Sequence, residues 1–243
     1  MEAMAALSPK FFRLPGGNNM EGNTNKTFWM WNNTIGPLKE RPGYDGTWGY
    51  EQTAGLGLVE YLLWAQDLAA EPSKSKYLNG QWIIANRWAV LAVWDGLALN
   101  GDVTPEDKIG IFVQDALNEL EFLMGDKSTH YGALRTSYGY PDPWNIKYVE
   151  VGNEDWLAGA PEGWESYKQY RFTAFLDAIA AKYPDIFVLA SGSVFDNMTI
   201  PAPAGGDYHD YQTPDGFVEQ FDQFDQLTIH NQTLLGKLSY SQV

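Results

Sequence analysis

The chain has 243 residues, of which 44% are hydrophobic, so it can bury one large core. It carries 31 acidic residues against 16 basic ones, and the net charge of −15 repels phosphate backbones and anionic lipid. We therefore expect neither nucleic acid nor a membrane as a partner. The lack of Cys excludes disulfides and thiolate zinc sites. The 10 Trp and 14 Tyr suit either a sugar ligand or a large aromatic core.

The first half of the chain begins with a segment typical of the end of a helix. The apolar run at 11–14 predicts a short strand, which Pro15-Gly16-Gly17 ends. Residues 15–52 predict a long loop rich in Asn, Gly and Trp, and loops of this length often shape a site. Helical spacing of apolar residues predicts a helix over 56–68, and the continuous apolar run at 90–94 predicts a buried strand.

The second half continues the same strand-then-helix order. Thr104 with Pro105 resembles a helix start, so we expect an N-cap at Thr104 and a helix that reaches Met124. Residues 146–151 and 187–190 predict strands, and 163–182 predict an amphipathic helix. Repeated units of this kind indicate an α/β fold, either a doubly wound sheet or a (β/α)8 barrel.

Both folds bind ligands at the carboxyl ends of their strands, and this rule selects candidate site residues. Asn153 and Glu154 follow the strand at 146–151, and Asn18 follows the strand at 11–14. A partly desolvated carboxyl such as Glu154 can keep its proton near neutral pH and act as a general acid at a glycosidic oxygen. An equally simple interpretation of Asn153-Glu154 is a polar strand end or an Asx-type turn. No Gly-rich phosphate-binding pattern opens a helix, which disfavours a nucleotide site.

Six segments together resemble the catalytic barrel of glycoside hydrolase family 51, the α-L-arabinofuranosidases, of the fungal type. The segments occur in the order of the family and read FFRLPGGNNMEGNT, WMWNNTIGPLKERPGYDGTWGY, LGLVEYLLWAQDL, LAVWDGLALNG, KYVEVGNEDWLAG and SYKQYRFTAFLDAIAAKYP. The resemblance implies a (β/α)8 barrel and a retaining reaction that releases terminal arabinofuranose from arabinoxylan or arabinan. It also implies an extracellular enzyme, although no signal peptide is recognised in the chain.

The resemblance also implies roles for individual residues. Glu154 matches the general acid/base at the end of the fourth strand, and Asn153 and Asn18 match amides that hold arabinose hydroxyls. The other matches are Arg13 as a supporting residue beneath the site, Trp48 as a loop aromatic near the leaving group, and His209 and Tyr211 at the end of the sixth strand. No cofactor or metal is expected, because the carboxylates do not cluster at ligand spacing and the three His (130, 209, 230) are scattered.

The chain departs from the family where the nucleophile is expected. The family carries a segment similar to LLGEYA, whereas here Leu234-Leu235-Gly236 is followed by Lys237. An ammonium group cannot form the glycosyl-enzyme ester, and it favours the ionised form of Glu154. We therefore expect the chain to be an inactive fragment of a retaining glycosidase.

The resemblance also predicts the domain organisation. Residues 1–243 are expected to form a partial catalytic barrel with about strands 2 to 6 or 7, without the first and eighth strands or the family's β-sandwich. Residues 73–87 are an atypical insertion and residues 237–243 an atypical tail. Ser73-Lys74-Ser75 and Gly236-Lys237-Leu238 can each be encoded by DNA that contains GTAAGT, a common intron start, so unspliced introns are one hypothesis for both segments. Open barrel edges predict instability or aggregation.

Two alternatives remain open from the sequence. One is a non-catalytic arabinose-binding protein that uses the same strand ends. The other is a different barrel hydrolase, of the xylanase or glucanase type, with the same Asn-Glu strand end. Asn-X-Ser/Thr triplets at Asn25, Asn32, Asn197 and Asn231 permit glycosylation on a secretory route, although such triplets are common by chance.

Overall fold

The computed structural model describes residues 2–6, 11–69, 76–78, 81–83, 88–159, 161–225 and 233–240. Within these ranges, one parallel sheet of six strands follows the order of the chain. Its strands are β1 (Phe11–Leu14), β6 (Trp88–Val93), β7 (Tyr148–Val151), β8 (Phe187–Ala190), β9 (Gly205–Gln212) and β10 (Thr233–Tyr240).

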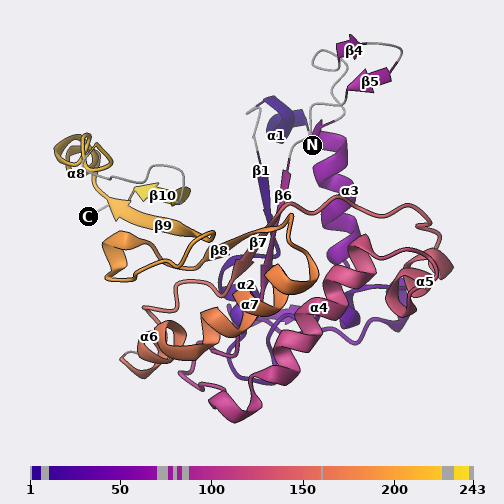
Figure 1. Cartoon of the computed structure of the whole chain (residues 1–243), viewed down its shortest axis with the longest axis horizontal. Helices are drawn as coiled ribbons and strands as arrows, with labels where there is room; N and C mark the ends of the chain where they lie inside the picture. Colours follow the sequence, from indigo (N-terminus) through magenta and orange to yellow (C-terminus); the bar gives the residue numbers. More distant parts are fainter. Residues whose placement is uncertain are drawn as a thin grey trace.

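The sheet is an incomplete (β/α)8 barrel. Its strand order never reverses, whereas a doubly wound sheet has a switch point. Figure 1 shows β1, β6 and β7 side by side in the centre, with β8, β9 and β10 fanning away from them as the sheet curls. The barrel prediction is therefore confirmed, and the doubly wound alternative is excluded.

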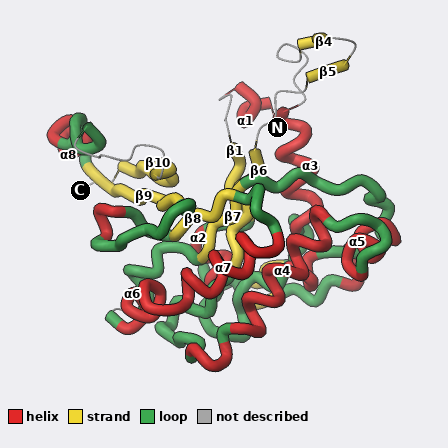
Figure 2. Tube along the Cα trace, viewed as in Figure 1, coloured by secondary structure: helices red, strands yellow, loops and turns green. Residues whose placement is uncertain are grey.

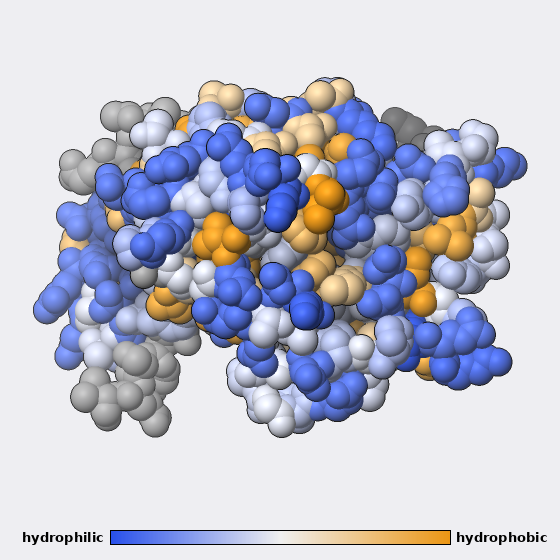
Figure 3. Space-filling model, turned by 90° about the horizontal axis from the view of Figure 1, so that it is seen from below, coloured by the Kyte–Doolittle hydropathy of each residue, from blue (hydrophilic) through white to orange (hydrophobic). Residues whose placement is uncertain are grey.

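Three long helices pack outside the strands (Figures 1 and 2). α3 (Leu58–Ala69) contacts β1 and β6, and α7 (Phe172–Lys182) contacts β8 and also α4 (Gly110–Met124). Helices cover the outer face of the sheet, and the inner face lines the interior of the barrel. Central strands therefore need apolar residues on both faces. Accordingly β6 buries consecutive residues, with Leu91 at 0% exposure. The face in Figure 3 is mainly hydrophilic, with hydrophobic residues in small separate groups.

The predicted helix at 163–182 is one continuous element with an irregular centre. It consists of α6 (Glu162–Ser166), a π-helical turn η4 (Tyr167–Arg171) and α7. Tyr167 and Arg171 at the ends of this turn are completely buried. π turns inside α-helices often occur at functional sites because they redirect side chains.

The prediction of an N-cap at Thr104 was wrong. The 3-10 helix η3 (Glu106–Lys108) begins after Pro105, no side chain caps it, and α4 follows directly. The backbone N–H of Thr104 instead donates to the carbonyl of Gly96, which closes the loop after β6. α5 (His130–Ser137), which the periodicity did not predict, packs against α4 and is capped by Thr129.

The predicted loop at 15–52 contains more regular structure than expected. Its elements are α2 (Gly17–Glu21), η1 (Trp31–Thr34), η2 (Leu38–Glu40), and the antiparallel pair β2 (Tyr44–Asp45) and β3 (Glu51–Gln52). Aromatic burial explains this order. Trp31 is 2% exposed and packs against Phe122 of α4, and Trp29 packs against Tyr61 of α3.

Several predictions fall at or beyond the limits of the described residues. The predicted insertion at 73–87 is described only at β4 (Lys76–Leu78) and β5 (Gln81–Ile83), which pair antiparallel in a sheet of their own. Part of the predicted atypical tail at 237–243 belongs to β10, which continues past Gly236 to Tyr240 beside β9. α1 (Glu2–Ala6) precedes β1 as expected. Among the described segments, none of the helices has both the length and the apolar character that a bilayer crossing needs.

Candidate functional site

A pocket of 370 Å³ opens where the carboxyl ends of β1, β7 and β9 converge. Its lining residues are Arg13, Gly17, Asn18, Trp48, Asn153, Glu154, His209 and Tyr211. The structure thus brings together every candidate site residue that the sequence predicted, from segments almost 200 positions apart. Gly17 is the one lining residue that the sequence did not single out.

Glu154 stands on a sharp turn directly after β7. Its φ of 47° lies in the left-handed region, which a non-glycine residue adopts only when its surroundings enforce it. Gly152 also has a positive φ, and a Cβ there would lie 2.1 Å from Oδ2 of Asp155, so only glycine fits. The turn formed by Gly152, Asn153 and Glu154 therefore directs the carboxyl of Glu154 into the pocket, and Glu154 is 7% exposed.

Two side chains from β9 contact Glu154. Nδ1 of His209 lies 2.6 Å from Oε1 of Glu154, and the hydroxyl of Tyr211 donates to the same oxygen at 2.8 Å. The other ring nitrogen of His209, Nε2, lies 2.8 Å from Oδ2 of Asp207. Burial lowers the pKa of His209, but the hydrogen bonds to Asp207 and Glu154 outweigh it and raise the pKa to about 9.

A second set of contacts holds the amide of Asn153, which is 1% exposed. Arg13 forms an ion pair with the buried Glu150 and donates from Nη2 to Oδ1 of Asn153 at 2.9 Å. Nδ2 of Asn153 donates to Glu21 at 2.7 Å. Burial, reinforced by the nearby Asp155, raises the pKa of Glu21 to about 8. The amide is thus fixed at both ends, with oxygen toward Arg13 and nitrogen toward Glu21.

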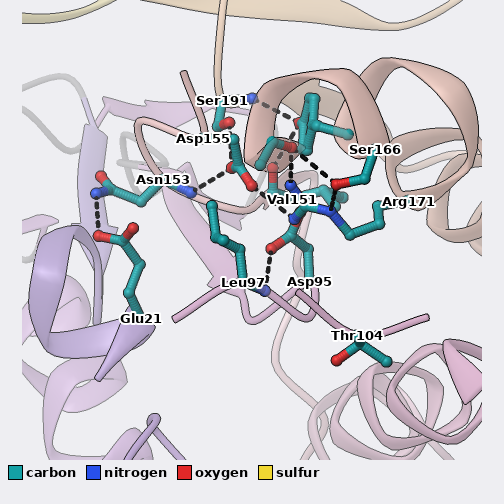
Figure 4. A network of polar contacts seen from close by, with 12 residues as sticks. Glu21, Asp95, Leu97, Thr104, Val151, Asn153, Asp155, Ser166, Arg171 and Ser191 are labelled. Atoms are coloured by element: carbon teal, nitrogen blue, oxygen red, sulfur yellow. Dashed lines mark hydrogen bonds and ion pairs between the residues drawn. The ribbon is translucent and has the colours of Figure 1, made fainter. Parts of the chain in front are cut away.

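Behind the turn, a buried ionic cluster anchors the end of β7 (Figure 4). Arg171 pairs with Asp95 and, at 2.6 Å, with Asp155, and all three side chains are at most 1% exposed. Asp155 also accepts hydrogen bonds from Ser191 at 2.6 Å and from the backbone N–H of Asn153 at 3.1 Å. Burial opposes the charge on Arg171, but the two carboxylates raise its pKa above the ordinary value. The cluster ties β6, β7, β8 and the π turn to the turn that carries Glu154.

Sequence reasoning missed Glu21, Asp95, Asp155, Arg171 and Asp207. Asp95 and Asp155 carried a usable signal, since each follows a predicted strand end. Arg171 lies inside a helical pattern whose irregular π turn cannot be seen in the sequence, and Asp207 gains its role only through contact with His209.

Two aromatic side chains flank the mouth of the pocket. Trp48, between β2 and β3, is 59% exposed, and Tyr211 is 42% exposed. The hydroxyl of Tyr44 in β2 donates to Oδ1 of Asn19 at 2.8 Å, which holds this hairpin against α2. Exposed rings beside buried polar groups suit a ligand with apolar faces and hydroxyl rims.

No metal centre is recognised in the part of the chain that the structure describes, since no group of three or more His, Cys, Asp or Glu is arranged to hold an ion. Of the two His assigned no role, His130 begins α5 and its ring contacts Tyr131, whereas His230 lies outside the described residues. The groups available in the pocket for binding or catalysis are carboxyl, imidazole, amide, guanidinium and aromatic side chains.

Fold and pocket together define an incomplete (β/α)8 barrel with a polar site at the carboxyl ends of its strands, the position used by barrel enzymes. Residues 3–229 match the family described as the Alpha-L-arabinofuranosidase 1 domain. The chain belongs to this family, the α-L-arabinofuranosidases of glycoside hydrolase family 51, as its six resembling segments predicted.

Individual relatives agree with this assignment. The chain is 48% identical over 229 residues to Alpha-L-arabinofuranosidase A of Aspergillus kawachii (strain NBRC 4308), covering 92% of this chain and 33% of the relative. Over 238 residues it is 48% identical to the Aspergillus niger protein of the same name, covering 96% and 35%. The arabinose-bound MgGH51 α-L-arabinofuranosidase superposes with a TM-score of 0.82 at 34% identity, over 98% of this chain and 34% of that one. The chain thus spans about a third of the length of these relatives.

Proposed function

We propose that the chain is part of a glycoside hydrolase that releases terminal α-L-arabinofuranose from arabinoxylan or arabinan, with Glu154 as the general acid/base. The observation that carries this proposal is the pocket itself. Its lining contains all the residues that the resemblance assigns to the sugar site, including Glu154, Asn153 and Asn18. A relative of this fold binds arabinose, which fits the small size of the cavity.

In this mechanism Glu154 protonates the departing glycosidic oxygen and later activates the water that completes hydrolysis. The amides of Asn153 and Asn18 hold sugar hydroxyls, and the fixed orientation of Asn153 keeps its remaining N–H and lone pair available for a hydroxyl. Arg13 supports the site by holding Asn153 and Glu150. Trp48 at the mouth stands where the leaving group departs.

A retaining reaction also needs a nucleophilic carboxylate about 5–5.5 Å from the acid/base. The backbone register pairs position 237 of β10 with His209, so position 237 stands beside the strand that contributes to the pocket. By the resemblance, position 237 is where the family carries its nucleophile, and this chain has Lys237 there. We therefore propose that the chain as it stands does not turn over substrate.

An assay on a chromogenic α-L-arabinofuranoside tests both parts of the proposal. The chain is compared with two chimeras in which it replaces the matching region of the Aspergillus kawachii relative, one with Lys237 and one with Lys237→Glu. We expect activity only with Lys237→Glu, and loss of that activity when Glu154→Gln is added. Turnover by the chain alone would mean that another carboxylate serves as nucleophile.

Lys237 also favours a second candidate, a non-catalytic arabinose-binding protein. Such a protein needs the sugar contacts of the pocket but no nucleophile. Calorimetric titration with L-arabinose separates the two candidates. Saturable binding by a monodisperse chain supports the binding protein, whereas an aggregating chain without affinity supports an enzyme fragment.

We also propose that the protein works outside the cell. The side chains of Asn25, Asn32 and Asn197 are exposed, as glycan acceptors must be, whereas Asn231 lies outside the described residues. Plant polysaccharides are too large to enter cells, so their hydrolases act on them externally. Treatment of protein purified from its natural source with an endoglycosidase tests this, and an unchanged mass argues against secretion through a glycosylating route.

A further inference from the structure

Asp207 lies behind the pocket and has no role in the function proposed above. It is 1% exposed and lies on β9 two residues before His209, so both side chains project from the same face of the strand. His209 lines the pocket, and Asp207 contacts the side of its ring that faces away from Glu154. The imidazole is therefore held between two carboxyl groups.

The two contacts determine which ring nitrogen can carry out proton exchange. An ionised carboxylate only accepts hydrogen bonds, so the 2.8 Å contact of Asp207 requires hydrogen on Nε2 of His209. Nδ1 is then the nitrogen that gains or loses a proton, and it lies 2.6 Å from Oε1 of Glu154. A buried carboxylate that selects the tautomer of an imidazole is a known device for presenting the opposite nitrogen to a reacting group.

Charged groups on two other strands act on His209, and a third strand has a residue in register with it. Arg13 of β1 opposes a positive ring, whereas Glu150 of β7 interacts favourably with it. On β10, the residue in register with His209 is Lys237. The contacts of Asp207 and Glu154 outweigh the opposing influences of burial and Arg13 and raise the pKa of His209 to about 9, which favours the protonated ring at neutral pH.

We propose that Asp207 is a positioning residue, which keeps a proton on Nε2 of His209 and so leaves Nδ1 to exchange one proton with Glu154. The proton passes from Nδ1–H to the Glu154 carboxylate, which then donates it to the leaving group and stays ionised; after Glu154 has taken a proton from water as base, that proton returns to Nδ1. No bond to carbon changes in this step. The relevance for hydrolysis rests on the proposed function, but the arrangement of the three side chains does not.

Nitrogen-15 NMR of the histidine rings of the full chain, from pH 5 to pH 10, tests the proposal directly. The signal of His209 is assigned with His209→Gln. We expect both ring nitrogens to carry hydrogen at pH 7, and Nε2–H to remain above the pKa of about 9. In Asp207→Asn the pKa of His209 should fall by about one unit or more, and the neutral ring should lose its preference for Nε2–H.

The matched control is Asp210→Asn, because Asp210 is a buried aspartate of the same strand whose side chain projects from the opposite face. This variant should leave the His209 signals unchanged. A neutral His209 in the unmodified chain at pH 7, or equal effects of the two variants, would overturn the proposal.

A second measurement uses the active chimera with Lys237→Glu. Asp207→Asn should lower kcat and shift the basic limb of its pH profile, while KM changes less than threefold. An unchanged pH profile counts against the proposal even where the NMR variant is poorly folded. If the NMR result holds but the chimera is inactive, the proposed function fails and the positioning role of Asp207 stands.

Discussion

Two polar clusters flank the turn that carries Glu154, and they differ in exposure and in protonation. The Arg171 cluster, formed with Asp95 and Asp155, is closed off from solvent. The His209 cluster, formed with Glu154 and Asp207, reaches into the pocket, where Glu154 retains 7% exposure. The comparison shows that the turn has two kinds of neighbour: one cluster that fixes its backbone and one that can exchange a proton with Glu154.

The Arg171 cluster supplies geometry. Burial raises the pKa of Asp95 well above its ordinary value, whereas the guanidinium of Arg171 keeps its charge at all relevant pH values, so the cation that holds the backbone does not titrate. The His209 cluster supplies a proton that can move, because imidazole and carboxyl groups both change charge in the working range of an enzyme. Separating the two tasks lets Glu154 change protonation while the strained turn beneath it stays in place.

The largest effect should come from Arg171→Met, which leaves Asp95 and Asp155 buried without their cation. Breaking one partner of a buried ion pair is strongly destabilising, by about 3–5 kcal/mol. We expect urea unfolding to show a loss of this size, or a chain that fails to fold. The control is Lys168→Met, because Lys168 pairs with the 54% exposed Glu165. A small effect of Arg171→Met would show that the cluster does not hold the turn.

An intermediate, pH-dependent effect is expected at Glu21, which accepts a hydrogen bond from Asn153, the residue directly before Glu154. Its folded pKa of about 8 lies above the ordinary value of 4.5, so the folded chain binds the extra proton between these values. The free energy of unfolding should therefore fall as pH rises from 4.5 to 8. In Glu21→Gln, which can still accept from Asn153, this fall should be reduced. Parallel pH curves for the two proteins would rule out an elevated pKa at Glu21.

The smallest effect should come from Lys182→Ala, which removes an ion pair far from either cluster. Nζ of Lys182 lies 3.3 Å from Glu121, and its side chain is 40% exposed. Surface pairs of this kind contribute about 0–1 kcal/mol and weaken with salt. Urea unfolding at low and at high salt measures the contribution. A loss comparable to that of Arg171→Met would remove the distinction between buried and exposed pairs.

Local sequence patterns predicted most of the fold. β1 and β8 occupy the predicted residues, and α3, β6 and β7 differ from prediction by a few residues at their ends. Apolar runs and helical spacing are local properties, so they remain visible without tertiary information. The predictions failed where long-range packing decides, as in the ordered stretch 15–52, which is held by aromatic contacts to α3 and α4.

The sequence by itself identified Glu154 as a site residue, because a carboxyl that directly follows a strand of a parallel α/β sheet stands at its functional edge. The periodicity left a doubly wound sheet and a (β/α)8 barrel open, and the six resembling segments pointed to the barrel and to the family. Only the tertiary structure decided the support of that carboxyl. Arg171, Asp207 and Glu21 act through partners 2 to 132 positions away in the chain. Ion pairs and tautomers depend on distances between side chains and on burial, and neither is contained in the spacing of residues along a chain.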